Sequence, residues 1–151
     1  SLATSGAPKQ QYSQRNQIPT RLALSVLFPK SFNYRMVTNV SEKYPEVGGQ
    51  QWDIVGGRID SGIPLLENLK REIKEEVGLI LKKEPRLIAA QDILRISGKH
   101  IVRLTYIGEI NGEPQLDQEE HSEYRWITIE EIKKLGGLDI YFKEIIDKGY
   151  L

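Results

Sequence analysis

The pattern of apolar and polar positions at the start of the chain predicts short strands joined by turns. Apolar, β-prone residues occupy 22–28 and 35–40, and a turn separates these two segments. Residues 52–55 predict a further short strand, which runs directly into Gly56-Gly57. The first part of the chain is therefore expected to be rich in β-structure and to lead into a glycine loop.

The pattern changes to helical periodicity at residues 65–77. At about 100° per residue, four apolar side chains fall on one face of the predicted helix. These side chains are Leu66, Leu69, Ile73 and Val77. Gly78 follows directly, and glycine is the residue that most often ends a helix. The sequence therefore predicts an amphipathic helix that packs one face on a core.

Strand patterns return after this helix. Residues 87–96 and 100–110 are two β-like segments separated by Ser-Gly-Lys, which predicts a hairpin. Residues 124–127 predict one more strand. Alternating strands and helices of this kind indicate an α/β fold, with a sheet covered by helices on two sides.

Two helices are predicted at the end of the chain. Thr128 is followed three residues later by Glu131, and this spacing matches a capping box. The capped helix should end near Gly136-Gly137. A last amphipathic helix is expected at 140–147.

Composition narrows the class of protein. We expect one domain at 18–151, containing a loop at 41–51 and preceded by a polar, flexible arm at 1–17. Lys and Arg number 21 and Asp and Glu also number 21, so no overall charge attracts a nucleic acid or an anionic membrane. The sequence has no cysteine, no signal peptide and no apolar segment of about 20 residues, which favours a cytoplasmic protein.

Acidic residues gather on one side of the helix predicted at 65–77. Glu72, Glu75 and Glu76 project within a sector of about 100°, so we expect these carboxylates to converge. Like charges that lie close together are stabilised by a cation, and ligands that offer only oxygen favour Mg²⁺ or Mn²⁺. The alternative for the acids alone is an ordinary solvated helix face.

The spacing around these acids resembles the Nudix box, which is usually written G-x5-E-x7-R-E-U-x-E-E-x-G-U with U a bulky apolar residue. The resemblance runs from Gly57 to Leu79, and every fixed position except one matches. The matching residues are Gly57, Arg71, Glu72, Ile73, Glu75, Glu76, Gly78 and Leu79. The departure is Ile63, which stands where the family has a glutamate.

This resemblance implies a Nudix-type α/β/α sandwich with a mixed sheet. It also implies metal-dependent hydrolysis of a nucleoside diphosphate linked to another group. Glu72, Glu75 and Glu76 would bind the metal together with the carbonyl of Gly57, and Arg71 would orient a carboxylate. Relatives use the missing glutamate to order the loop or the arginine, and Asp60 is the best candidate to replace it.

Three further residues are candidates for the site. Glu120 lies six residues before Trp126, a spacing similar to that of a loop acid in some relatives, so it is either a metal ligand or base or an ordinary loop charge. Arg58 follows the glycines, where a guanidinium could grip a phosphate instead of forming a surface ion pair. Trp52 could stack on a base, although packing in the core is the competing interpretation.

The sequence therefore leaves two functions open. The first is hydrolysis of a small nucleotide by water activated by Mg²⁺ or Mn²⁺. The second is a Nudix-fold module that senses a nucleotide without turning it over. The replacement of the family glutamate by Ile63 favours this alternative. Nucleoside triphosphates, nucleotide sugars and oxidised nucleotides all remain candidate substrates. Neither a nucleic acid nor a membrane is expected as partner, and a homodimer is left open.

Overall fold

The computed structural model describes residues 20–31, 33–40, 52–117 and 121–151. The arm predicted at 1–17 and the loop predicted at 41–51 lie outside the described residues, and so does Glu120. The helices are α2 (Leu65–Val77), α3 (Ile129–Lys133) and α4 (Ile140–Asp147).

The first sheet is a mixed sheet of four strands in the order β5-β1-β7-β6. Its central strand, β1 (Thr20–Leu27), pairs in parallel with β7 (His100–Ile107) and antiparallel with β5 (Val55–Arg58). β6 (Arg86–Ile93) pairs antiparallel with β7. The predicted hairpin and the predicted mixed sheet are both confirmed.

The second sheet is antiparallel and is centred on β3 (Tyr34–Val40). This strand pairs with β2 (Pro29–Lys30), with β4 (Trp52–Asp53) and with β8 (His121–Thr128). The chain therefore leaves the second sheet after β4 and enters the first sheet at β5. The single strand predicted at 52–55 is in fact two short strands in different sheets.

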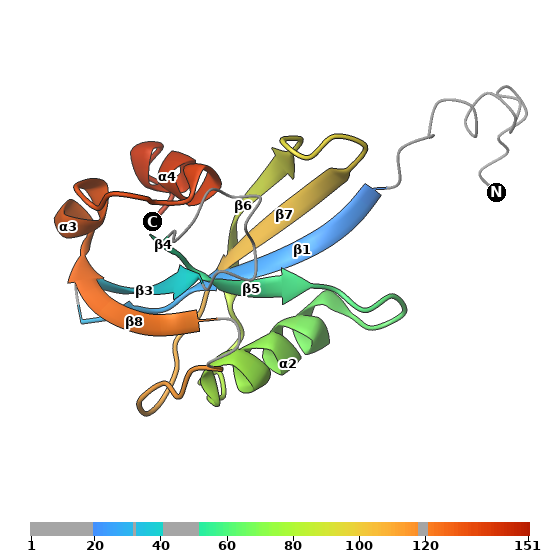
Figure 1. Cartoon of the computed structure of the whole chain (residues 1–151). Helices are drawn as coiled ribbons and strands as arrows, with labels where there is room; N and C mark the ends of the chain where they lie inside the picture. The colour runs from blue at the N-terminus through green and yellow to red at the C-terminus, as the bar shows by residue number, and fades with distance from the viewer. Residues whose placement is uncertain (1–19, 32, 41–51, 118–120) are drawn as a thin grey trace, which may run out of the picture.

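The three helices lie on opposite sides of the sheets (Figure 1). α2 covers one side, where it contacts β5 and β1, and α3 and α4 lie on the other side, with α4 against β6. This arrangement is the α/β/α sandwich that the sequence predicted. None of the helices in the described residues is long and apolar enough to cross a membrane.

Alternate residues of β1 belong to two separate cores, as expected for a strand buried on both faces. Leu24 and Val26 pack with Leu69, Ile73 and Val77 of α2 in the first core. Leu27 packs with Val37, Ile132 and Phe142 on the side of α3 and α4. The packing of these apolar side chains sets the rotation of α2 about its own axis. This rotation determines which acidic side chains of the helix face β5.

The helix boundaries agree closely with the sequence analysis. α2 and α4 span the predicted residues, and Thr128 and Glu131 form the predicted capping box, although α3 already ends at Lys133. Leu66, which was expected on the buried face of α2, is only partly buried. Asn68 and Glu76 are buried instead.

Candidate metal and active site

The glycines that were expected in a loop lie inside β5. Both positions require glycine, because neighbouring groups leave no room for a side chain. A Cβ atom on Gly56 would lie 2.3 Å from the carbonyl oxygen of Leu24 on the paired strand β1. A Cβ atom on Gly57 would lie 2.4 Å from Oε2 of Glu72 on α2. These contacts bring the backbone of β5 directly against an acidic side chain of α2.

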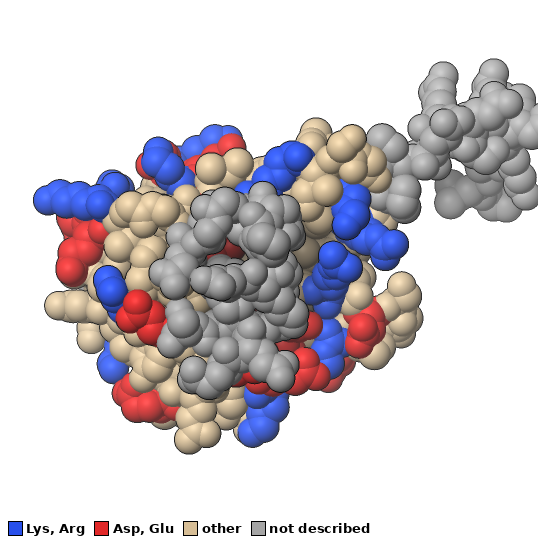
Figure 2. Space-filling view, viewed as in Figure 1, with Lys and Arg blue, Asp and Glu red and all other residues tan. Residues whose placement is uncertain are grey.

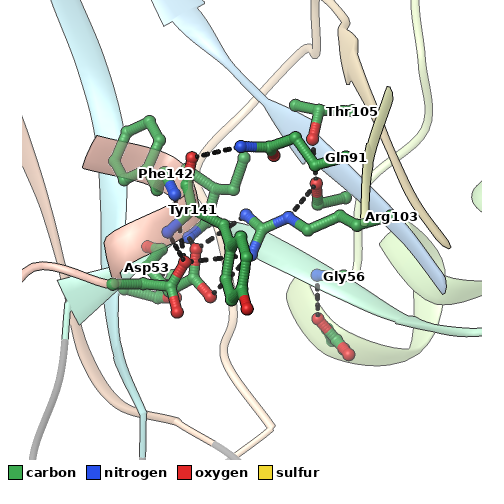
Figure 3. A network of polar contacts seen from close by, with 12 residues as sticks. Asp53, Gly56, Gln91, Arg103, Thr105, Tyr141 and Phe142 are labelled. Carbon is green, nitrogen blue, oxygen red and sulfur yellow. Dashed lines mark hydrogen bonds and ion pairs between the residues drawn. The ribbon is translucent and has the colours of Figure 1, made fainter. Parts of the chain in front are cut away.

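The acids of α2 occupy three different environments. The side chain of Glu72 is 13% exposed and lies against Gly57. Glu76 is buried, and its Oε2 accepts a hydrogen bond of 3.3 Å from the backbone N–H of Gly56 (Figure 3). Glu75 is 62% exposed. Two carboxylates therefore lie along β5, and the third faces solvent.

The expectation that all three carboxylates converge is not met. Among the residues that the structure describes, no group of three or more acidic, histidine or cysteine side chains is close enough to hold a metal ion. Glu76 accepts a hydrogen bond from the backbone N–H of Gly56. Glu72 and Glu75 instead lie beside the guanidinium of Arg71, at 2.8 and 3.9 Å. An incomplete protein cage still fits Mg²⁺, which keeps several waters and uses one or two carboxylates together with substrate phosphate.

Arg71 joins the glycine strand, the following loop and α2 through its guanidinium. Nη2 donates to the carbonyl of Arg58 at 3.1 Å and to Oε1 of Glu72 at 2.8 Å. Nη1 donates to Asp60 and to Oδ1 of Asn68. The hydrogen bond to Glu72 raises the pKa of Arg71 above its usual value. The structure thus brings together Arg71, Glu72 and Gly57 as the sequence predicted.

Other predicted residues are placed as follows. The side chain of Arg58 is exposed at the end of β5. Trp52 is 7% exposed within the core beside α3 and α4, and the guanidinium of Arg125 lies 4.5 Å from its ring centroid. This placement favours packing and does not offer Trp52 as a surface for base stacking. Ile63 is 43% exposed, so it does not form part of the core.

The position of Asn68 in the site was not predicted from the sequence. This residue is fully buried and its side chain contacts both Arg71 and the loop before α2. Asparagine is a weak helix former, because its amide competes for backbone hydrogen bonds. An asparagine in the second turn of a helix that has no side-chain cap was therefore a usable signal.

A second arginine lies at the centre of a buried polar network on the opposite face of the first sheet (Figure 3). Arg103 of β7 donates to both oxygens of Asp53, at 2.9 and 3.3 Å, and to Asp139 at 3.2 Å. Its Nε donates to Ser25 at 3.0 Å. A charged residue in the middle of an apolar strand was the sequence signal for this network.

The surface charge agrees with an anionic substrate beside an acidic helix. In Figure 2, acidic side chains gather over α2, and Lys and Arg side chains lie next to them over the ends of β1 and β5. Acids can hold a divalent cation, and basic groups can bind the oxygens of a phosphate. The arrangement suits a substrate that contains phosphate and carries a metal.

The model of the NUDIX domain matches residues 21–148. A MutT NUDIX hydrolase from Burkholderia pseudomallei is similar in structure with a TM-score of 0.74 and 20% identity, over 85% of this chain and 97% of that one. A MutT protein from Methanosarcina mazei Go1 has a TM-score of 0.75 and 22% identity, over 86% and 92% of the two chains.

A UDP-X diphosphatase has a TM-score of 0.65 and 16% identity, over 96% of this chain and 73% of that one. A search of curated sequences gives no significant match. Identities of this size show that the fold is shared and do not carry a substrate from one protein to another.

Proposed function

Because this chain belongs to the NUDIX domain family of hydrolases, we propose that it cleaves a phosphoanhydride bond of a nucleoside diphosphate linked to another group. The observation that carries this proposal is the position of Glu72, whose carboxylate lies against Gly57 and is held by Arg71. Glu72 and Glu76 thus lie along the glycine backbone of β5. Basic side chains lie close to the acidic surface of α2 (Figure 2).

We assign metal binding to Glu72, Glu75, Glu76 and the carbonyl of Gly57. A bound Mg²⁺ or Mn²⁺ supplies a water of lowered pKa and neutralises charge on the phosphate oxygens. Arg71 holds Glu72 in place, and the exposed Arg58 can bind a phosphate in a bidentate way. Because Glu75 is exposed, a rotation of its side chain away from Arg71 would let it join the other two acids.

The proton of the attacking water needs a base, and we propose Glu120 as base or additional metal ligand. Glu113 is a suitable control, because it is an exposed acid of the same connection and lies 3.4 Å from Lys30. Glu120→Gln should lower the rate at saturating substrate more than Glu113→Gln does. Equal rates for the two variants would make Glu120 an ordinary loop charge.

The test of the function is a substrate panel with purified protein. Nucleoside triphosphates, nucleotide sugars and oxidised nucleotides are supplied with Mg²⁺ or Mn²⁺, and release of phosphate, pyrophosphate or a nucleoside monophosphate is measured. We expect turnover of at least one class that disappears with EDTA and in Glu76→Gln. The balanced charge fits a small substrate better than a nucleic acid, and the lack of cysteine fits a cytoplasmic protein. Both a monomer and a homodimer are compatible with this function.

The alternative is a nucleotide sensor, which the loss of the family glutamate at Ile63 supports. A wild-type protein that binds nucleotide and metal but turns over no member of the panel would favour the sensor. Turnover that appears only in Ile63→Glu would favour it further.

A further inference from the structure

The loop between β5 and α2 is fastened to the helix without the glutamate of the Nudix box. Ile63 occupies that position with a side chain that is 43% exposed, and only its backbone carbonyl takes part in the fastening. Another residue must therefore order the loop and Arg71. The polar contacts around Arg71 identify which one.

Asn68 is the centre of these contacts and is fully buried. Its Nδ2 donates to the carbonyl of Ile63 at 2.9 Å and to that of Pro64 at 3.2 Å. Its Oδ1 accepts from the backbone N–H of Asp60 at 2.8 Å and from Nη1 of Arg71 at 2.9 Å. One buried amide thus joins the loop at three points to the guanidinium of the box arginine.

We propose that Asn68 is a positioning residue, which fixes the guanidinium of Arg71 and through it the carboxylate of Glu72. This inference rests on the proposed function, because Glu72 is one of the carboxylates assigned to the metal. Asp60 assists from the loop, where its carboxylate pairs with the same Nη1.

The geometry explains why an amide suits this place, because its Nδ2 donates to the loop carbonyls while its Oδ1 accepts from Arg71. Arg71 directs Nη1 to Asn68 and Asp60, which leaves Nη2 for Glu72 and for the backbone of Arg58. A planar guanidinium cannot turn one nitrogen without turning the other. Loss of the acceptor at Asn68 would leave Nη1 with the exposed carboxylate of Asp60 alone. The plane of Arg71 would then be held less firmly, and so would its hydrogen bond to Glu72.

Two substitutions separate positioning from packing. Asn68→Leu keeps the approximate volume and removes every hydrogen bond, whereas Asn68→Asp keeps the acceptor for Arg71 and loses only the donors to the loop carbonyls. The probe is Mn²⁺ alone, titrated against protein without substrate and followed by the electron paramagnetic resonance of the free ion. Groups that orient metal ligands typically contribute about 10- to 100-fold to affinity. We expect Asn68→Leu to weaken Mn²⁺ binding by about ten-fold or more, and Asn68→Asp to restore most of it.

Thr128→Ala is the matched control. It removes the capping hydrogen bond of α3, far from Arg71, so it should lower thermal stability without changing Mn²⁺ affinity. Asp60→Asn supplies a second variant if Asn68→Leu does not fold, and it should weaken Mn²⁺ binding in the same direction.

Three results would overturn the proposal. They are a folded Asn68→Leu that binds Mn²⁺ like the wild type, equal binding by the Leu and Asp variants, and a loss of affinity in Thr128→Ala as large as in Asn68→Leu. Failure of the proposed function looks different, because the wild type would then bind Mn²⁺ and hydrolyse no member of the substrate panel.

Discussion

Two arginines, each surrounded by carboxylates, organise opposite faces of the first sheet. The side chain of Arg71 is 27% exposed, and two of the three acids beside it reach solvent, with Asp60 at 64% and Glu75 at 62%. The side chain of Arg103 is 8% exposed, and its partner Asp139 is 3% exposed. The same ion-pair chemistry is therefore open to a ligand on one face and closed on the other.

Hydrogen bonding of the carboxylates also differs between the two faces of the sheet. Asp139 also accepts hydrogen bonds of 3.0 Å from the backbone N–H groups of Tyr141 and Phe142, so it caps α4 as well as pairing with Arg103. Its oxygens are committed to the fold. Around Arg71, by contrast, exposed carboxylate oxygens can still accept a cation. Exposure and unused lone pairs, more than the presence of acids, distinguish a candidate metal site from a structural network.

Burial and the neighbouring charges together set the pKa values in the network around Arg103. Burial alone would lower the pKa of Arg103, but the charges of Asp53 and Asp139 raise it above its usual value. The pKa of Asp53 is raised by burial and, to a smaller extent, by Asp139, although the charge of Arg103 opposes this shift.

The largest expected effect is on stability, in Arg103→Met. This change removes the cation beside Asp53 and leaves the buried Asp139 with only the longer ion pair to Arg95, at 3.4 Å. Breaking one side of a buried ion pair costs about 3–5 kcal/mol. Urea unfolding should show a loss of this size, while metal affinity of the folded fraction stays at the wild-type value. A stable variant that has lost metal binding would place Arg103 in the site and end the contrast between the two faces.

A smaller effect is expected from Ile63→Glu, which restores the family glutamate in the loop before α2. Because Ile63 is exposed, the new charge is not buried, and the free energy of unfolding should change by less than about 0.5 kcal/mol. The metal concentration for half-maximal rate should fall about two- to five-fold, which corresponds to the roughly 0.5–1 kcal/mol that an exposed pair of opposite charges contributes. An unchanged metal dependence would mean that Asp60 and Asn68 already replace the glutamate completely.

The smallest effect concerns the pH dependence of stability at Asp53. Its pKa in the folded state lies above the ordinary value of 3.8, so between these two values the folded chain holds a proton that the unfolded chain has lost. This contribution to stability is fully present below the unfolded pKa and is lost as pH rises through the folded pKa. The free energy of unfolding of the wild type relative to Asp53→Asn should therefore fall with rising pH in this window. A difference that grows with pH would contradict the raised pKa.

Local features of the molecule could be predicted from the sequence. The bounds of α2 follow from apolar periodicity and Gly78, and the start of α3 follows from the capping box. The resemblance of residues 57–79 to the Nudix box identified Arg71 and Glu72 as candidate site residues, because the box is a continuous segment whose spacing can be read from the sequence.

Features that depend on distant segments could not be predicted. Arg103 meets Ser25 across 78 residues and Asp139 across 36 residues, and no local pattern encodes these separations. The chain changes from the second sheet to the first just before Gly56, where β5 pairs closely with β1. The sequence around the glycines does not show that β1 lies there. The inward turn of Glu76 has the same origin, since its partner is the backbone of β5.

The most direct test of this account compares one acid from each face by Mn²⁺ binding in the absence of substrate. Glu72→Gln removes a carboxylate beside Arg71, and Asp53→Asn removes one beside Arg103. We predict that Glu72→Gln weakens Mn²⁺ binding by about ten-fold or more, whereas Asp53→Asn binds Mn²⁺ as the wild type does. Equal affinities for the wild type and Glu72→Gln, or a selective loss in Asp53→Asn, would contradict the assignment of the metal site to the α2 face.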